Sequence, residues 1–278
     1  TWFVGNSIGG GVPLLNHSIH PNYGARYGAN FFAPNVTFGP LGDQYLGDAK
    51  VYHPEDQLPP VYEMQQFLNN SFERVVNTAT GIGNTPEEKQ DIKAFMVEMF
   101  NKTANGTIAH PPVNDSGDLS TVGYACEVLK WFRPTLTVVN LSGVDGCHSS
   151  FTGYLGALHR ADHAVGHLWN FIQTQVPEMT GNTTIIAVPE CGRNGEPNAI
   201  LDQNDWVSFD HSDANALRVF GMMAGAGVEA GLMVGNEDNP IGLVTDLVPT
   251  FAELLGFKQD VLGAGLIAPG SMSLFDRI

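Results

Sequence analysis

The chain has 278 residues, 43% of them hydrophobic, which is enough for one large core or two small ones. Its 13 Lys and Arg residues against 29 Asp and Glu residues give a formal net charge of −16. Such a surface repels nucleic acids and anionic membranes, so neither is expected as a partner. No stretch reaches the ~18 unbroken apolar residues that a membrane span requires.

The first residues and the sequons favour an exported protein. Residues 1–4 include no initiator Met and begin as if already within a strand, so we expect a truncated or processed N-terminus from which a signal peptide or a longer piece was removed. Asn-x-Ser/Thr acceptors are frequent, although many arise by chance in an Asn-rich chain. They are Asn16, Asn35, Asn69, Asn101, Asn105, Asn114, Asn140 and Asn182. We expect a secreted, periplasmic or cell-surface location.

The first 100 residues combine one strand, a long loop and two helices. Residues 1–12 indicate a strand that runs into a glycine-rich turn at Gly9-Gly10-Gly11. Residues 13–58 lack periodicity, and a loop of that length in a compact domain tends to be functional. A short helix over 61–68 follows Pro59-Pro60. A capping box at residues 85–88 then starts a helix that reaches about Phe100.

From residue 118 onward, predicted helices alternate with predicted strands. A helix over 118–132 leads directly into the apolar strand 136–141, and the helix 151–173 leads into the strand 184–188. The predicted inner stripe of the second helix is Tyr154, Leu155, Leu158, Ala161, Val165, Leu168 and Ile172. His159, His163 and His167 recur on another face, where they could bind a metal or simply be surface or hydrogen-bonded histidines.

The C-terminal part completes the same pattern. Residues 217–223 are predicted to be a strand, and residues 246–255 a capped helix with Gly256 just beyond its end. Neither an internal repeat nor a low-complexity linker is present. We therefore expect one α/β domain over residues 1–278, with a mostly parallel sheet. Ligands of such sheets lie beyond the carboxyl ends of the strands.

Three strand tips carry metal-capable side chains. Residues 145–148 follow one apolar strand, residues 190–193 follow another, and residues 210–213 come about twenty residues later. We expect the three tips to meet at one site. Asp145, His148 and His211 together make an Asp-His-His set, which suits Zn²⁺ or Mn²⁺ with one position left open.

This region resembles the metal-binding region of the alkaline phosphatase superfamily, to which sulfatases, phosphodiesterases and cofactor-independent phosphoglycerate mutases belong. The similarity covers residues 120–260 well and residues 1–70 loosely. It rests on an ordered series of segments. They are Asn140-Leu-Ser-Gly-Val-Asp145-Gly-Cys-His148, Tyr154-Leu-Gly-Ala-Leu158, Ala161-Asp-His-Ala-Val-Gly166, residues 182–194, Asp210-His211, Thr245-Asp-Leu-Val-Pro-Thr-Phe-Ala-Glu-Leu-Leu-Gly256 and Leu58-Pro-Pro-Val-Tyr-Glu63.

The resemblance implies a three-layer α/β/α sandwich with a mostly parallel central sheet and two metals beside a phosphate or sulfate ester. Asp145, His148 and His211 match the ligands of one metal. For the second metal the family has Asp-His where this chain has Glu190-Cys191, and an Asp where its first strand ends in Asn6-Ser7. Both changes weaken that second site, because a clamp between two metals needs its ligands in place.

The remaining candidate residues keep several roles open. Thr37 is the hydroxyl left for a nucleophile, apart from a tyrosine, and Arg193 could face an anionic oxygen or form an ordinary salt bridge. Cys147 and Cys191 could be packed thiols or a disulfide, and Cys191 could instead bind the metal. Asp213 could orient His211 or cap a local turn.

Two classes of function follow from this pattern. One is a metal-dependent phosphoric or sulfuric ester hydrolase acting on a small anionic ester. The other is a degenerate relative that serves as a binding, structural or assembly-forming surface protein, with homo-oligomers or a surface assembly as its partners. We favour a degenerate member that binds one ion rather than two. Zinc is the expected ion, and manganese or calcium are the alternatives.

Overall fold

The structure, a computed structural model, describes two compact units, Thr1–Thr180 and Gly181–Ile278. The described residues are 1–5, 30–32, 86–109, 117–202 and 204–278. The glycine-rich turn, the short helix over 61–68 and most of the long loop 13–58 therefore lie outside them. That residues 1–278 form a single domain stays a prediction.

A three-stranded parallel sheet organises the first unit. β1 (Trp2–Gly5) lies between β2 (Asn30–Phe32) and β3 (Thr137–Asn140), with Trp2 opposite both Asn30 and Thr137. The predicted strand over 136–141 is confirmed as β3. The strand β2 falls within the predicted loop 13–58, because three residues are too few to show the alternation that marks a strand.

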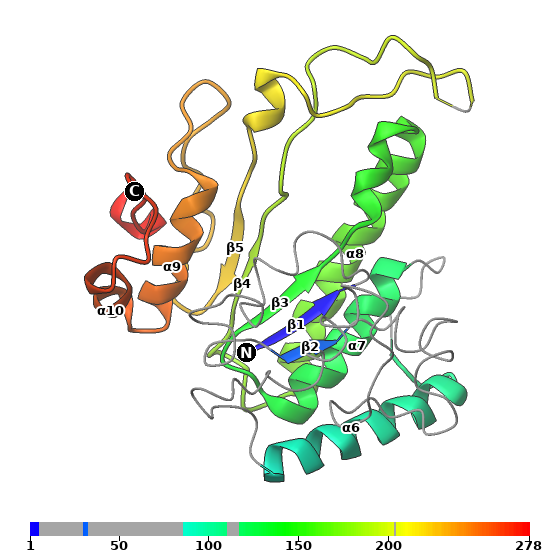
Figure 1. Cartoon of the computed structure of the whole chain (residues 1–278), viewed down its shortest axis with the longest axis vertical. Helices are drawn as coiled ribbons and strands as arrows, with labels where there is room; N and C mark the ends of the chain where they lie inside the picture. The colour runs from blue at the N-terminus through cyan, green and yellow to red at the C-terminus, as the bar shows by residue number, and fades with distance from the viewer. Residues whose placement is uncertain (6–29, 33–85, 110–116, 203) are drawn as a thin grey trace, which may run out of the picture. The chain divides into compact units, whose positions relative to one another are not determined.

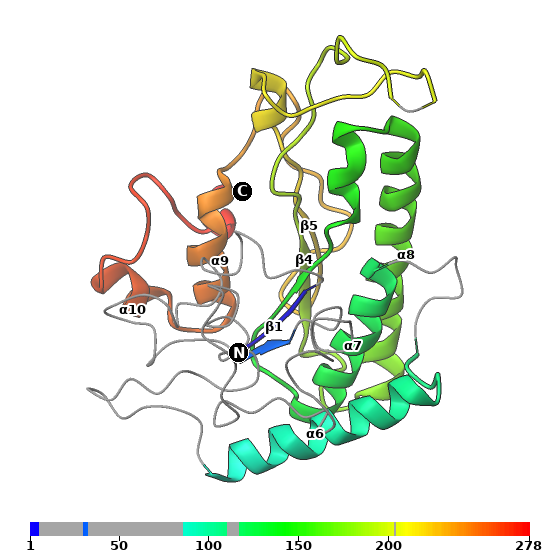
Figure 2. The same cartoon turned by 45° about the vertical axis from the view of Figure 1, so that its right-hand side comes forward.

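An aromatic core joins the sheet to two helices. α6 (Pro86–Ala104) crosses the lower end of α7 (Gly117–Phe132) in two views (Figure 1 and Figure 2). Phe95 of α6 contacts the rings of Trp2, Phe32, Trp131 and Phe132 at centroid distances of 4.9–6.1 Å. Such contacts add to the free energy of burying the rings themselves. The predicted helices over 85–100 and 118–132 are thus confirmed.

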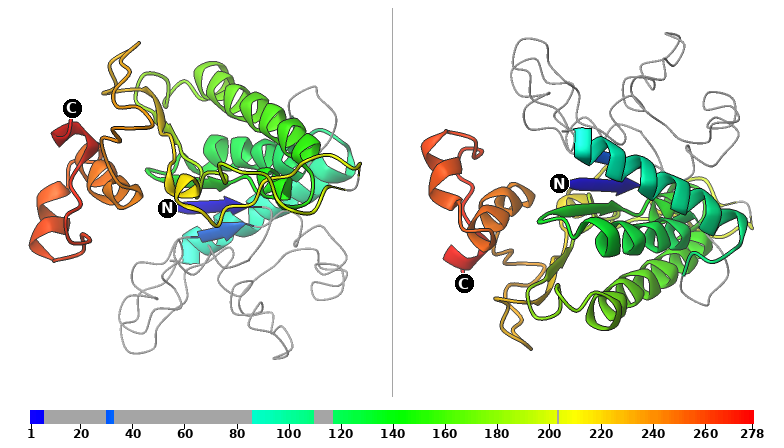
Figure 3. Two further views of the ribbon diagram at one scale, coloured as in Figure 1. Left: turned by 90° about the horizontal axis from the view of Figure 1, so that it is seen from above. Right: turned by 90° about the horizontal axis from the view of Figure 1, so that it is seen from below.

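α8 (Phe151–Gln175) packs on the opposite side of α7, so that α7 lies between the strands and α8 (Figure 3). The predicted helix is confirmed, and its predicted inner stripe is right in part, since Ile172 is buried and Leu168 packs against the core. The buried residues of α8 are Ala157, Ala164, Phe171 and Ile172, whereas Leu155 is 49% exposed and Leu158 is 42% exposed. Ala164 belongs to a buried cluster with residues of α7, and Ala157 lies beside Gly143. A count of large apolar residues does not reveal such small buried residues.

The second unit holds a separate two-stranded ribbon. β4 (Thr184–Ala187) pairs antiparallel with β5 (Met222–Gly225). The strand expected over 217–223 therefore begins later and runs antiparallel. A parallel sheet is found in the first unit alone, and the described residues show mixed α/β structure without the expected three-layer sandwich around one central sheet.

Short helices lie between the two strands of the ribbon and after them. They are η4 (Ala214–Leu217) before β5, and η5 (Val244–Asp246), α9 (Leu247–Leu254), α10 (Lys258–Gly263) and η6 (Leu274–Asp276) after it. The predicted helix over 246–255 is confirmed as the end of η5 followed by α9. Gly256 has φ 80°, the left-handed conformation expected of a glycine just past a helix end. Within the described ranges, no helix is long and apolar enough to span a membrane.

Candidate metal centre

The chain leaves β3 through a turn that a buried carboxylate holds in place. Asp118, in the first turn of α7, is 3% exposed. Its Oδ1 accepts a hydrogen bond from the Ser142 N–H at 3.0 Å, and its Oδ2 accepts one from the Gly143 N–H at 3.0 Å. Gly143 approaches so closely that a Cβ there would collide with Oδ2. Asp118 of α7 thereby fixes the backbone position from which the following turn starts.

Those next residues form η3 (Gly143–His148), a single 3₁₀ segment that carries Asp145 and His148. The Asp145 N–H donates to the Ser142 carbonyl at 3.1 Å, which starts the turn at the point anchored by Asp118. The Asp145 side chain is 64% exposed and that of His148 is 38% exposed. Both potential ligands are therefore accessible from solvent.

The spacing of the two ligand atoms suits one metal ion. Asp145 Oδ1 and His148 Nε2 lie 3.1 Å apart and form a hydrogen bond. Two donors that each lie about 2.1 Å from a tetrahedral Zn²⁺ are about 3.4 Å apart, so a few tenths of an ångström would admit the ion. Ser150 caps α8 by accepting a hydrogen bond from the Gly153 N–H at 3.0 Å, and this fixes the chain just after His148.

Two of the three predicted tips meet within the second unit. The Asn194 N–H donates to the Asp210 carbonyl at 2.7 Å, and Asn194 Oδ1 accepts from the Ser212 and Asp213 N–H groups at 2.6 and 2.8 Å. Gly192 is needed in this contact because a Cβ there would collide with the Arg218 carbonyl. Residues 190–195 and 210–218 therefore form a pair of loops that hydrogen bonds hold together.

His211 is carried by this loop pair. Its N–H donates to Asp210 Oδ1 at 2.8 Å, and its Nε2 lies 4.0 Å from the same oxygen. Asp213 caps η4 by accepting from the Asn215 and Ala216 N–H groups, and its other oxygen accepts from the Gly195 N–H at 2.8 Å. Of its two predicted roles, Asp213 thus has the local cap.

The predicted ligands and catalytic residues fall in different parts of the molecule. Asp145 and His148 lie together in the first unit, whereas His211 belongs to the second, so its place in the same ligand set stays a prediction. In the second unit Glu190 is exposed and Cys191 is half-buried. Their part in a second metal site stays a prediction.

The roles of the other predicted site residues stay predictions. Thr37 and the side chain of Cys147 lie outside the described residues, so the structure tests neither the nucleophile nor the Cys147–Cys191 disulfide. The Arg193 carbonyl accepts a hydrogen bond from Asn215 Nδ2 at 2.8 Å, which holds the loop backbone. The third cysteine, Cys126, is buried in α7, and burial followed by the nearby Glu127 charge raises the pKa of its thiol.

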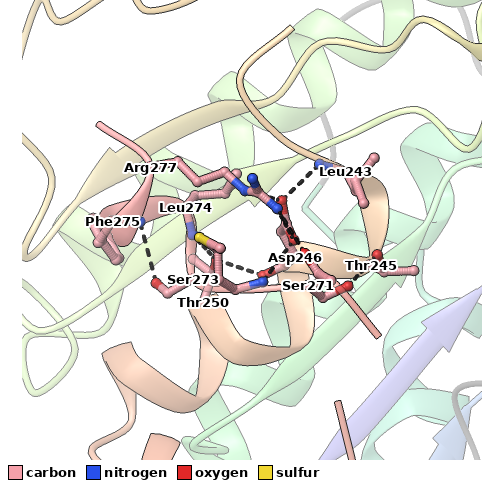
Figure 4. Close-up of polar contacts among 11 residues, drawn as sticks. Leu243, Thr245, Asp246, Thr250, Ser271, Ser273, Leu274, Phe275 and Arg277 are labelled. Atoms are coloured by element: carbon pink, nitrogen blue, oxygen red, sulfur yellow. Dashed lines mark hydrogen bonds and ion pairs between the residues drawn. The ribbon is translucent and has the colours of Figure 1, made fainter. Parts of the chain in front are cut away.

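The Asp-x-x-Pro-Thr segment, residues 246–250, has a structural role that its sequence pattern did not reveal. Asp246 is fully buried and accepts hydrogen bonds from the Leu243 N–H at 2.7 Å, the Met272 N–H at 3.0 Å and Arg277 Nε at 2.6 Å (Figure 4). Thr250 Oγ1 donates to the Asp246 carbonyl at 2.7 Å and accepts from the Leu274 N–H at 2.8 Å. Both motif side chains tie the C-terminal residues to α9.

The Asp246 carboxylate is stabilised in its charged form. Burial alone would raise its pKa, but the Arg277 hydrogen bonds, the two backbone N–H donors and the Arg277 charge outweigh burial and lower the pKa. With its oxygens committed to Arg277 and the backbone, Asp246 has no lone pair directed at a ligand.

Sequence reasoning missed Asp118 and the partner of Asp246. Asp118 contacts residues about 24 positions further along, and Arg277 lies 31 positions after Asp246. No local pattern indicates such a pairing. Comparisons with protein-family models, curated proteins and solved structures gave no match.

Proposed function

We propose that this is an exported alkaline phosphatase/sulfatase-like protein that holds one divalent ion, preferably Zn²⁺, through Asp145, His148 and His211. Its second metal site is degenerate, and its ester-hydrolase activity is weak or absent. The observation that carries the proposal is the 3.1 Å separation of Asp145 Oδ1 and His148 Nε2 on an exposed turn anchored by Asp118. A turn fixed at its base can present two ligands without a large ordering cost.

The donor set supports one ion more than two. A carboxylate and two imidazoles are a common ligand set for Zn²⁺, which also leaves a position for water or substrate. The Glu190-Cys191 pair lacks the imidazole that the resemblance requires, and the residue that follows β1 is Asn6. When bound, the ion would polarise an ester oxygen or lower the pKa of a water. Arg193 and Thr37 remain the proposed contacts to such an ester.

We also propose that the two units together build the three-layer sandwich. A two-stranded ribbon by itself is marginally stable in water, so β4 and β5 would gain stability by joining a larger sheet. Residues 181–278 expressed alone should then fail to give the cooperative unfolding transition of the whole chain. A fragment that unfolds cooperatively by itself would contradict this arrangement.

Metal content measured by mass spectrometry tests the metal centre. The full chain is loaded with Zn²⁺ and dialysed to remove loosely held ions. We expect one Zn²⁺ per chain, lost in Asp145→Ala, in His148→Ala and in His211→Ala. Glu237→Gln, which removes another exposed carboxylate, serves as the control and should keep the ion. Retention of Zn²⁺ in His211→Ala would contradict the three-ligand set.

Turnover of aryl phosphate and aryl sulfate by the same proteins separates the two functional classes. A degenerate member should show little turnover over the zinc-free protein. Two ions per chain, together with turnover that Asp145→Ala abolishes, would instead establish an active two-metal hydrolase. An ion-free protein with a Cys147–Cys191 disulfide would leave only the binding or structural role.

A further inference from the structure

We propose that His159 and His163 of α8 form a second, separate metal site, a two-histidine chelate for a divalent transition-metal ion such as Ni²⁺, Cu²⁺ or Zn²⁺. This site belongs to the first unit alone and does not depend on the Asp145–His148 centre. The sequence spacing allows such a site, and the structure shows which pair of the three histidines in the row can form it.

The two imidazoles lie side by side on one exposed face of α8. Residues four apart are neighbours on a helix surface, and both side chains are exposed. Their ring centroids are 4.6 Å apart, with the ring planes at 86°. The next turn leaves room beside His163, since a Cβ built on Gly166 would meet nothing within 4 Å.

The separation of the rings agrees with that of two imidazoles on one ion. A ligand nitrogen lies 2.0–2.1 Å from the ion, which places each ring centroid about 3 Å from it. Two such rings at 90–110° around the ion have centroids about 4.5–5 Å apart. The observed 4.6 Å falls within this range. The second side-chain torsion of histidine is broad, so exposed rings can turn their nitrogens toward a shared ion at small cost.

His167 differs from this pair although it continues the same row. It is half-buried, and its ring lies against Phe171 with the centroids 6.4 Å apart. Turning His167 toward His163 would separate it from Phe171. The charged neighbours of the pair offset each other, because Arg160 and Asp162 carry opposite charges on the same turn.

Only two protein ligands hold the ion, so water fills its other positions and binding is exchangeable. Imidazole suits Ni²⁺, Cu²⁺ and Zn²⁺, and affinity should rise from Ni²⁺ to Cu²⁺ in the usual order. An ion held by both rings links consecutive turns of α8 and should stabilise the folded chain by mass action.

Calorimetric titration of the full chain with Ni²⁺ tests the site. The titration uses an Asp145→Ala, His148→Ala background, so that the proposed zinc centre does not contribute. We expect one Ni²⁺ per chain at micromolar concentration. His159→Gln and His163→Gln should each weaken binding by at least about tenfold. The double variant should lose no more than either single variant, because a chelate is lost with its first ligand.

His167→Gln is the matched control and should leave Ni²⁺ binding unchanged. Far-UV circular dichroism of each variant checks that α8 persists, since Gln is a good helix former at an exposed position. Losses that add up across the two single variants would show independent imidazoles and overturn the chelate. Unchanged Ni²⁺ binding in the double variant would overturn the site altogether.

Discussion

Asp145 in the η3 turn and Asp246 at the start of α9 are both acids in segments from which the sequence analysis predicted a metallohydrolase, yet their surroundings are opposite. The Asp145 side chain is 64% exposed and contacts one imidazole. Asp246 is fully buried and receives hydrogen bonds from two backbone N–H groups and from Arg277. An exposed acid can exchange its partner for an ion, whereas an acid saturated by internal donors can only hold the fold together.

The largest expected effect comes from breaking the Asp246 network. Arg277→Met should lower the free energy of unfolding of the second unit by about 3 kcal/mol, because it leaves a buried carboxylate without its counter-charge. Urea unfolding followed by circular dichroism measures the change. Zn²⁺ content should stay the same relative to folded protein. Loss of Zn²⁺ from the folded variant would mean that this network also serves the metal centre.

The next effect concerns Asp118, which anchors the turn that carries the proposed metal ligands. Gly143→Ala places a Cβ against the Asp118 carboxylate, which its own hydrogen bonds hold in position. We expect a loss of about 1–2 kcal/mol in stability together with weaker Zn²⁺ binding. Gly146→Ala in the same turn is the control, because a Cβ there meets nothing within 4 Å. Equal Zn²⁺ affinity in both variants would show that the anchor does not position the ligands.

Acid should weaken the Asp246 network over a defined range. The folded-state pKa of Asp246 lies below its ordinary value of 3.8, so the folded chain binds fewer protons there than the unfolded chain. This contribution to stability is fully present above about pH 5 and is lost as the pH falls through the folded-state pKa. Urea midpoints from pH 6 to pH 2 should therefore fall less steeply in Asp246→Asn. Equal dependence of the urea midpoint on pH in the two proteins would contradict the attribution of this effect to Asp246.

The smallest effect is expected from Lys258 and its two acidic partners, Glu253 and Asp276, beside that network. Lys258 Nζ lies 2.9 Å from Glu253 Oε2 and 2.5 Å from Asp276 Oδ2, and these hydrogen bonds raise its pKa. Lys258→Met should still change the unfolding midpoint little, since exposed ion pairs contribute little and are screened by salt. A loss as large as that of Arg277→Met would show that the Lys258 ion pairs, and not the buried Asp246–Arg277 pair, hold the C-terminus.

The elements were more predictable than their packing. Period and capping signals identified α6, α7, α8, β3, β4 and the α9 region within a few residues. The buried face of α8 was predicted only in part: Ile172 was included, but Ala157 and Ala164 contribute little to an apolar count and were missed. The direction of β5 was also missed, since a strand's own residues do not state which neighbour it pairs with.

Local sequence alone determined which side chains could serve chemistry. Asp145 and His148 are close in the chain, so one turn brings them together whatever the rest of the fold does. Only tertiary structure decided that Asp118 anchors that turn and that Arg277 forms an ion pair with Asp246. Both contacts join residues more than twenty positions apart. Burial and hydrogen-bond saturation are properties of the packed chain, and here they separate an acid available to a metal from an acid that stabilises the fold.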